Sequence, residues 1–286
     1  MNTLPNNYGG LDKDYSDYNN AKIVVLPIPF DETSTWGKGA DKGPEAIIDA
    51  ARNMELYDIE TNSEVYTNGI FTAKPITSKK SEKMVSDSYQ AVKKYLEDGK
   101  FVVTLGGEHS ISNGPIQAHA EAYEKLSVLH LDAHSDRRNE YEGTKYSHAS
   151  IIARVEEMVE NVVSVGIRSL DASELPALKN KKIFFAEDIM DSDAWMTKVV
   201  KELSEQVYIT IDLDVFDPSI LPATGTPEPG GMYWYQVLKL LKMVADKKEI
   251  VGFDVVELAP NKTEKSSDFL ASKLIYKILS YKFSKK

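Results

Sequence analysis

Cysteine is absent from this chain of 286 residues. That absence excludes disulfide bonds, catalysis by a thiolate, zinc held by Cys ligands and iron–sulfur clusters. Any bound metal ion must therefore use His, Asp or Glu as its ligands, and the chain contains five histidines.

The sequence also shows no pattern typical of a signal peptide or of a membrane-spanning segment. Residues 1–20 are polar and acidic, without the basic start and the apolar stretch of a signal peptide. No apolar run approaches the length that crosses a bilayer. We therefore expect a cytoplasmic protein that does not enter a membrane.

Positive charge is in the minority. The 34 Lys and Arg residues are outnumbered by 44 Asp and Glu, which gives a net charge of −10 with neutral His. A protein that binds nucleic acid needs a basic face, so this balance argues against that class. The balance favours a cationic or metal-bound substrate, although acidity also serves solubility alone.

The rest of the composition is that of a globular protein. Hydrophobic residues make up 42% and charged residues 27% of the chain, and this length buries a core without covalent staples. The sequence shows neither a low-complexity linker nor a repeat of fixed period. We therefore expect a single domain over residues 1–286, in which residues 1–20 form a polar N-terminal extension.

Short β-rich runs alternate with longer amphipathic runs along the chain. The β-rich runs are continuous in Val, Ile and Leu, which is typical of parallel strands covered on both faces. Repeated strand–helix units predict the α/β class, with three α/β/α layers around a mostly parallel sheet of about eight strands. The expected strands are 22–30, 64–71, 101–107, 127–134, 162–169, 182–189, 207–215 and 250–258, and the expected helices are 43–58, 78–98, 112–125, 147–158, 192–206, 233–248 and 268–283.

Acidic and histidine residues gather where these strands end. The run GGEH follows one strand at 106–109, DAHSD follows another at 132–136, and DLD closes a third at 212–214. Open parallel sheets bind ligands at the carboxyl ends of their strands. Residues two apart in an extended chain point to the same side, so two of these strand ends each present a pair of ligands.

Several carboxylates in one crevice need compensation. A single Asp at a strand end is usually a turn residue, and an isolated His is more often packed in a core than bound to a metal. Four carboxylates, however, repel one another strongly, and two divalent ions would neutralise them. We therefore predict a metal site. Its oxygen-rich ligands, with two imidazoles and no sulfur, suit Mn²⁺ more than Zn²⁺, with Co²⁺, Ni²⁺ or Fe²⁺ as alternatives.

These motifs resemble the signatures of the ureohydrolase family, which includes arginases and agmatinases. GGEH at 106–109, DAHSD at 132–136 and IDLDVFDP at 211–218 resemble its three signatures, and TGTPEPGG at 224–231 and DVVEL at 254–258 also match. The resemblance runs from about residue 24 to the last predicted helix. It implies the arginase-type fold, two manganese ions per subunit and a homotrimer or homohexamer.

The resemblance also implies a role for each site residue. One manganese ion would be bound by His109, Asp132, Asp136 and Asp212, and the other by Asp132, His134, Asp212 and Asp214, so that Asp132 and Asp212 bridge the two.

Three further positions, together with Asp136, carry implied roles in catalysis and substrate binding. His148 corresponds to the proton-shuttling histidine, and Glu257 to the carboxylate that holds the planar guanidinium by paired hydrogen bonds. Asp136 would orient the attacking hydroxide as well as bind metal. Asp171 corresponds roughly to a contact for the substrate amino group. The products would be urea and an amine.

The substrate tail is read from the segments around these motifs. Residues 137–143 depart from the polar loop with which arginases read a carboxylate, whereas TGTPEPGG and YSHAS resemble agmatinases. Agmatine, hydrolysed to putrescine and urea, is therefore the main interpretation, and N1-aminopropylagmatine, which leads to spermidine, is its rival. Acidic candidates near the mouth are Glu140, Glu142 and Asp171. Arg137 and Arg138 would oppose a cation if they pointed inward, and could instead serve the carboxylate of guanidinobutyrate.

Two interpretations from other classes stay open. The chain could be a metal-binding regulator without catalysis, which the presence of His148 and Glu257 argues against. It could also be a two-metal phosphoesterase, which the lack of a convincing phosphate-binding Gly loop argues against. Weaker expectations concern six further residues. His119 and His130 are expected to be structural, and Glu108 to contact metal ligands without binding a metal. Asp217 is expected in a turn or in contact with a ligand, Arg168 in an ion network that is structural or at a subunit contact, and Trp36 either in the wall of the site or simply packed.

Overall fold

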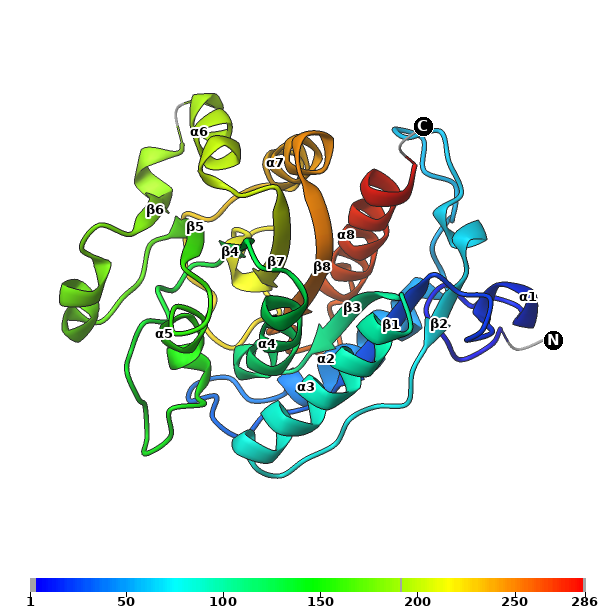
Figure 1. Cartoon of the computed structure of the whole chain (residues 1–286), viewed down its shortest axis with the longest axis horizontal. Helices are drawn as coiled ribbons and strands as arrows, with labels where there is room; N and C mark the ends of the chain where they lie inside the picture. Colours follow the sequence, from blue (N-terminus) through cyan, green and yellow to red (C-terminus); the bar gives the residue numbers. More distant parts are fainter. Residues whose placement is uncertain (1–3, 191, 285–286) are drawn as a thin grey trace.

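Eight strands form one sheet at the centre of the molecule (Figure 1). The computed structural model describes residues 4–190 and 192–284. Every pairing between neighbouring strands in these residues is parallel, which confirms the predicted α/β class. In spatial order the strands are β2 (Ile70–Thr72), β1 (Ile23–Ile28), β3 (Phe101–Gly106), β8 (Glu249–Val256), β7 (Gln206–Asp212), β4 (Leu126–Leu131), β5 (Asn161–Ile167) and β6 (Lys182–Phe185).

Successive residues of a central strand face opposite layers. In β1, Ile23 and Val25 belong to one buried apolar cluster, while Val24 and Leu26 belong to another. All six residues of this strand are buried. A strand covered on both faces needs apolar residues at every position, which is why it reads as a continuous apolar run.

Helices cover the two faces of the sheet (Figure 1). The three layers confirm the predicted α/β/α arrangement. On one face α2 (Gly43–Ala51), α8 (Ser266–Phe283), α7 (Trp234–Lys247) and α6 (Ala194–Glu202) pack in series, and on the other α3 (Ser81–Glu97), α4 (Asn113–Ala122) and α5 (Ile151–Val155) do so.

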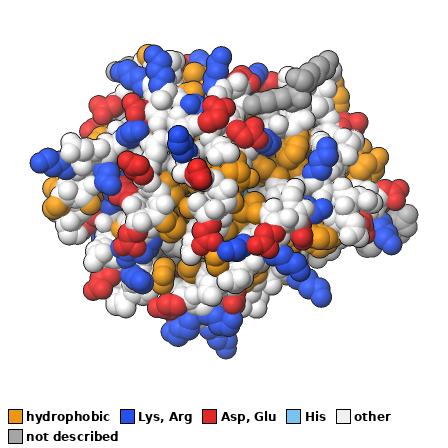
Figure 2. Space-filling model, viewed as in Figure 1, with side chains coloured by type: hydrophobic (Ala, Val, Ile, Leu, Met, Phe, Trp, Pro, Cys, Tyr) orange, Lys and Arg blue, Asp and Glu red, His pale blue; other side chains and the backbone are white. Residues whose placement is uncertain are grey.

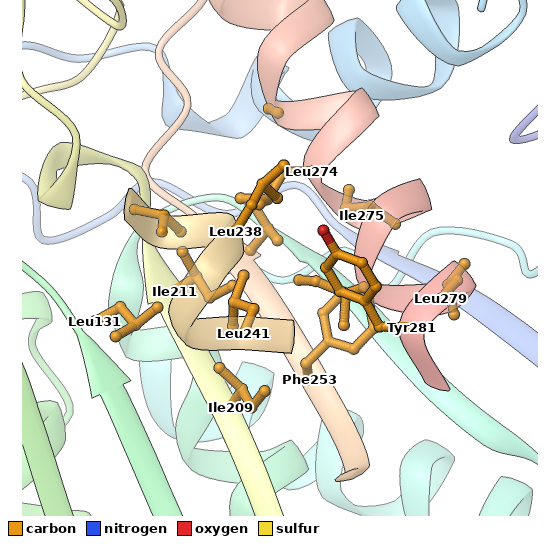
Figure 3. Close-up of a cluster of buried hydrophobic side chains, with 14 of the residues drawn as sticks. Leu131, Ile209, Ile211, Leu238, Leu241, Phe253, Leu274, Ile275, Leu279 and Tyr281 are labelled. Atoms are coloured by element: carbon orange, nitrogen blue, oxygen red, sulfur yellow. The ribbon is translucent and has the colours of Figure 1, made fainter. Parts of the chain in front are cut away.

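The largest buried apolar cluster lies between the sheet and the layer that contains α7 and α8 (Figure 3). Leu238 and Leu241 of α7 and Ile275 of α8 lie over Ile211 and Phe253 of the strands. Burial of apolar surface stabilises a fold by about 25 cal/mol per Å². This cluster therefore fixes β7 and β8, whose carboxyl ends carry polar residues.

Several elements are shorter than predicted. The strand expected at 127–134 ends at Leu131 because the next main-chain N–H groups bond to carboxylates: Ala133 N–H donates to Asp214 and His134 N–H to Asp132. The helix expected at 147–158 is a 3₁₀ turn at His148–Ser150 followed by α5.

The N-terminal segment contributes to the core. Tyr8 is buried, and its hydroxyl donates to the carbonyl oxygen of Ser272 in α8 at 2.8 Å. Leu11 lies in the largest apolar cluster, and a short helix, α1 (Lys13–Ser16), follows it. The segment predicted as a polar extension, residues 1–20, therefore contains two apolar anchors that its overall composition hid.

The surface mixes charges of both signs. Figure 2 shows Lys and Arg interspersed with Asp and Glu on the face drawn there, without a large patch of one sign. Within the described part of the chain, every helix is too short or too polar to cross a membrane.

Candidate active site

The polar strand ends meet at one edge of the sheet. Strands β3, β8, β7 and β4 are consecutive in space, although the chain visits them in a different order. Such a change of order opens a crevice at the carboxyl ends of the strands. These four strands lead there to His109, Glu257, Asp212 and Asp132.

The ring of His109 faces three carboxylates. Its Nδ1 lies 3.1 Å from Asp132 Oδ2, 3.2 Å from Asp136 Oδ2 and 3.4 Å from Asp212 Oδ2. All four side chains are buried. His109 Nδ1 has no well-aligned hydrogen-bond partner among the described residues. Three carboxylate oxygens and the ring nitrogen thus lie close together, an arrangement typical of the ligands of a metal ion.

Thr210 fixes the tautomer of the His109 ring. Its hydroxyl lies 2.9 Å from His109 Nε2 and donates to Asp254 Oδ1 at 2.7 Å. The other possible acceptor of its proton, Ser112 Oγ, lies farther away, at 3.4 Å. A hydroxyl has one proton, so Nε2 must be the donor to Thr210. The lone pair of Nδ1 in the neutral ring then faces carboxylates, an arrangement that a bound cation would stabilise.

His134 and Asp214 form a second group beside the first. His134 Nδ1 lies 2.8 Å from Asp214 Oδ2 and 3.6 Å from Asp132 Oδ1. Main-chain donors hold the carboxylates in place, because His134 N–H bonds to Asp132 Oδ1 at 2.5 Å and Asp214 N–H to Asp212 Oδ1 at 2.9 Å. All six predicted metal ligands thus lie in one connected group, in which Asp132 belongs to both halves.

Electrostatic repulsion points to the same need for cations. Burial and the charge of Asp132 raise the pKa of Asp136 to about 7. Burial and the charges of Asp214 and Asp132 raise the pKa of Asp212 well above its usual range. These carboxylates can all be ionised at neutral pH only if positive charge balances them. The His/Asp clusters, which are rich in oxygen donors, therefore fit divalent metal ions.

His130, which the sequence predicts to be structural, contacts a predicted metal ligand. His130 Nε2 lies 2.7 Å from Asp132 Oδ2, and its Nδ1 lies 3.1 Å from Ser164 Oγ. The hydroxyl oxygen of Ser164 in turn accepts a hydrogen bond from Arg137 at 2.9 Å. His130 therefore orients the carboxylate that both groups share. The signal in the sequence was its position two residues before Asp132 on a strand, which puts both on one side.

Asp136 and Glu257 share an unusual backbone conformation. Their φ angles are +52° and +66°, in the left-handed region that costs non-glycine residues about 1–2 kcal/mol. Main-chain hydrogen bonds hold both: the Asp136 carbonyl accepts from the start of α5, and Glu257 N–H donates to Gly107 O at 2.8 Å. Strain of this kind concentrates at functional sites, and both residues line the same cavity.

That cavity has a volume of about 270 Å³ and lies over the His/Asp clusters. Glu257 lines it, and one of its oxygens accepts the His109 main-chain N–H at 2.6 Å. His148 lines it from the 3₁₀ turn. Burial and the positive charges of His134 and His109 lower the pKa of His148 to about 4. The fold therefore brings His148 and Glu257 to the same cavity as the predicted metal ligands.

Asp171 lines this cavity with a half-exposed side chain. It caps the 3₁₀ helix Ala172–Leu178 by accepting the Ser173 N–H at 3.0 Å. Arg138 Nη2 lies 3.6 Å from an Asp171 oxygen, and the Arg138 guanidinium lies 4.6 Å from the ring centroid of Tyr141. The carboxylate of Asp171 at the mouth of the cavity therefore lies beside the guanidinium of Arg138.

The other charged candidates of the loop lie elsewhere. Arg137 is buried and donates to Glu156 at 3.0 Å, so it does not oppose a cation in the cavity. Glu140 and Glu142 are exposed, and the described residues that line the cavity do not include them. Of the acids proposed for the mouth, only Asp171 lines the cavity.

Contacts bear on four of the weaker expectations. Arg168 donates to main-chain carbonyls, among them those of Asp214 and Glu228, so within one subunit loop carbonyls contact its guanidinium, and an ion network at a subunit contact stays a prediction. Asp217 is a turn residue that accepts three main-chain N–H groups. Trp36 lines the cavity mouth but is 82% exposed. Glu108 contacts the loop at Thr33 and is not among the described residues that line the cavity.

Comparison with known proteins supports one family. Residues 21–280 match the model of the Arginase family. The chain is 35% identical to N(1)-aminopropylagmatine ureohydrolase of Synechocystis sp., over 93% of this chain and 90% of that protein, and 31% identical to agmatinase of Pyrococcus horikoshii, over 92% and 93%. The crystal structure of agmatine ureohydrolase of Thermoplasma volcanium matches with a TM-score of 0.89 and 30% identity, covering 99% of this chain and 96% of that chain. The chain therefore belongs to the arginase family, as a hydrolase of the ureohydrolase type.

Proposed function

We propose that this chain hydrolyses a guanidino compound with a cationic tail, in the first instance agmatine, to urea and putrescine. The observation that carries the proposal is the placement of Glu257 and His148 around one cavity above the His/Asp clusters. Two Mn²⁺ ions per subunit are the proposed cofactor, because the donors are oxygen-rich and include no sulfur. They would be held by His109, Asp132, His134, Asp136, Asp212 and Asp214.

Glu257 is the proposed acceptor for the substrate guanidinium. One of its oxygens is held by the His109 N–H, which leaves the other for the substrate. Burial and the neighbouring Glu108 charge raise the pKa of Glu257 well above its usual range. A guanidinium, which stays charged at all physiological pH values, would favour the ionised carboxylate and bind it by charge-assisted hydrogen bonds.

His148 is the proposed carrier of the proton. Two divalent ions in the clusters would supply a hydroxide nucleophile near neutral pH, and Asp136 is the carboxylate proposed to orient it. Burial lowers the pKa of His148 from its usual range, so its ring is neutral at pH 7 and can accept a proton. It would then pass that proton to the amine nitrogen that leaves the guanidino carbon.

N1-aminopropylagmatine is a second candidate, favoured by specific observations. The Synechocystis relative named for it is 35% identical to this chain. Asp171 at the cavity, together with Glu228, whose Oε1 lies 3.8 Å from His134 Nε2, would place acids along a longer cation. Guanidinobutyrate is disfavoured, since Asp171 and Glu174 already lie 3.6 and 3.9 Å from the Arg138 guanidinium nitrogens.

The test is urea release from the Mn²⁺-loaded protein with agmatine, N1-aminopropylagmatine, arginine and guanidinobutyrate in parallel. Fast release from agmatine with arginine inert supports the main proposal. A preference for aminopropylagmatine replaces the substrate but keeps the mechanism. Absence of urea from all four, with two metal ions bound, overturns the activity in favour of a metal-binding regulator. Asp132→Ala serves as the inactive control.

Two further properties are proposals that rest on the sequence and its resemblance. We propose a cytoplasmic protein that assembles as a homotrimer or homohexamer and binds no nucleic acid. Light scattering after size-exclusion chromatography measures the assembly, and a mass of one subunit would contradict it.

A further inference from the structure

Three side chains stand in series behind the cavity at His148. The hydroxyl of Thr33 donates to Glu108 Oε1 at 2.6 Å. The same hydroxyl oxygen accepts the His148 main-chain N–H at 3.0 Å and lies 3.2 Å from His148 Nδ1. Glu108 is fully buried and Thr33 nearly so. A buried carboxylate is thus connected through one hydroxyl to the imidazole.

Glu108 is arranged as an acceptor on both oxygens. Its Oε2 accepts the main-chain N–H groups of Thr33 at 2.6 Å and Ser34 at 3.0 Å. Its Oε1 accepts the hydroxyls of Thr33 and Ser110, each at 2.6 Å. The main-chain N–H groups of Thr33 and Ser34 have a fixed direction, so they hold Oε2 of Glu108 and leave Oε1 facing the Thr33 hydroxyl. An acceptor in that place draws the Thr33 proton toward itself.

The proton count at Thr33 then determines the tautomer of His148. A threonine hydroxyl has one proton, and here Glu108 takes it. The remaining lone pairs of Thr33 Oγ1 meet the His148 main-chain N–H and Nδ1, so the shorter contact of Nδ1, to Thr33 at 3.2 Å, is a hydrogen bond only if Nδ1 carries the proton. Ser147 Oγ also approaches Nδ1, at a longer 3.3 Å. The ring nitrogen left for the cavity is Nε2, without a proton.

We propose that Thr33 and Glu108 are positioning residues that keep the proton of neutral His148 on Nδ1 and so present the Nε2 lone pair to the cavity. The catalytic consequence rests on the proposed function, in which Nε2 takes up and delivers a proton. The opposite tautomer would present an N–H there and could not accept one. We call this series of Glu108, Thr33 and His148 the relay. It gives a role to a buried glutamate that lies next to His109 in the chain and binds no metal in this scheme.

The relay is tested by the tautomer of His148 itself, measured by NMR from the ring ¹³Cδ2 and ¹⁵N shifts of protein loaded with diamagnetic Zn²⁺. The His148→Ala variant identifies the signal among five histidines. Wild type is expected to show the Nδ1–H form. In Glu108→Gln the amide oxygen can keep both main-chain donors while its NH₂ faces Thr33, which reverses the hydroxyl and shifts His148 toward Nε2–H. Ser110→Ala is the matched control, because it removes a donor to the same Glu108 oxygen without touching His148.

Activity provides a second measurement on the Mn²⁺-loaded protein. Thr33→Val keeps the shape but removes the hydroxyl, and should lower kcat by about 10- to 100-fold, the usual effect of losing a group that orients a catalytic or ligating side chain. KM and the content of two metal ions should change little, whereas Thr33→Ser should restore kcat to within about threefold of wild type.

The outcomes separate this proposal from the proposed function. A wild-type Nε2–H form, or the same tautomer in wild type and Glu108→Gln, overturns the relay whether or not urea is released. An Nδ1–H form that reverses in Glu108→Gln and persists in Ser110→Ala supports it, even if no tested guanidino compound is hydrolysed. If Glu108→Gln fails to fold, Thr33→Val decides: an unchanged tautomer and kcat overturn the relay.

Discussion

The main-chain N–H of His109 donates a 2.6 Å hydrogen bond to the carboxylate of Glu257. The residue whose ring faces three aspartates is thereby joined, through its backbone, to the residue proposed to hold the guanidinium. Glu257 pays for this position with a left-handed φ of +66°. A main-chain hydrogen bond therefore sets how far the proposed guanidinium acceptor lies from a predicted metal ligand.

Replacement of Glu257 by Gln should weaken substrate binding and turnover while leaving the fold intact. A hydrogen bond to a charged group contributes about 1.5–3 kcal/mol, so kcat/KM for agmatine should fall by about 10- to 100-fold. Steady-state kinetics and metal analysis measure both properties. Glu202→Gln, at the exposed end of α6, is the control, and kinetics like those of the control would remove Glu257 from the pocket.

Metal removal should destabilise the protein more at high pH than at low pH. Without cations, burial and Asp132 raise the pKa of Asp136 from 3.8 to about 7. A carboxyl whose folded pKa is raised loses its stabilising contribution as pH rises from about 4 through about 7. The rise in Tm on adding Mn²⁺ to chelator-treated protein should therefore grow between pH 5 and pH 8. An equal rise at every pH would contradict this coupling.

His148→Ala should lower turnover far more than metal content. Acid–base groups contribute about 10²- to 10⁴-fold to a rate, so kcat should fall by at least about 100-fold with two metal ions still bound. His119→Asn is the matched control, because His119 is buried in α4 and bonds to Pro115 O away from the site. Retention of more than half the wild-type kcat in His148→Ala would exclude it as the proton carrier.

Asp171→Asn should affect the tail of the substrate and not its guanidinium. Asn still caps the following 3₁₀ helix, but it leaves the charge of Arg138 without its neighbour at 3.6 Å. Exposed charges in water interact weakly, so kcat/KM should fall by no more than about fivefold, and more for N1-aminopropylagmatine than for agmatine. Kinetics at low and high salt measure this, with Glu140→Gln as the control. An equal loss for a guanidine that lacks a cationic tail would contradict it.

Lys277→Met should destabilise the docking of α8. Lys277 Nζ lies 2.9 Å from Asp58 Oδ2 and 2.6 Å from Glu60 Oε2, and the side chains of Lys277 and Asp58 are buried. Removing one partner leaves Asp58 buried and unpaired, which costs about 3 kcal/mol. Urea unfolding measures this loss. Lys239→Met, which breaks the exposed pair with Asp193, should cost less than about 0.5 kcal/mol, and an equal cost for both would refute the argument.

The sequence alone predicts the class of fold and the chemistry of the site. Continuous apolar strands with amphipathic helices between them require a sheet covered on both faces, and Figure 1 shows that sheet. The spacing of Asp132 and His134 at a strand end is local, and residues two apart on extended chain lie on one side. For Asp212 and Asp214 the same expectation is wrong in its reason, because Asp214 lies in a 3₁₀ turn at Leu213–Val215, where its N–H bonds to Asp212 Oδ1.

Tertiary structure decided what depends on distant segments meeting. The order β3-β8-β7-β4 brings His109 beside Asp212, which is about a hundred positions away in the chain. The tautomers follow from Thr210 and Thr33, polar residues whose partners come from other strands and loops and whose own sequence neighbourhood carries no signal. Arg137 and Arg138 are adjacent in sequence, yet one is buried against Glu156 and the other lines the cavity. Residue type and spacing set the available chemistry, but packing determines which atoms face each other, because hydrogen bonds require partners within about 3 Å.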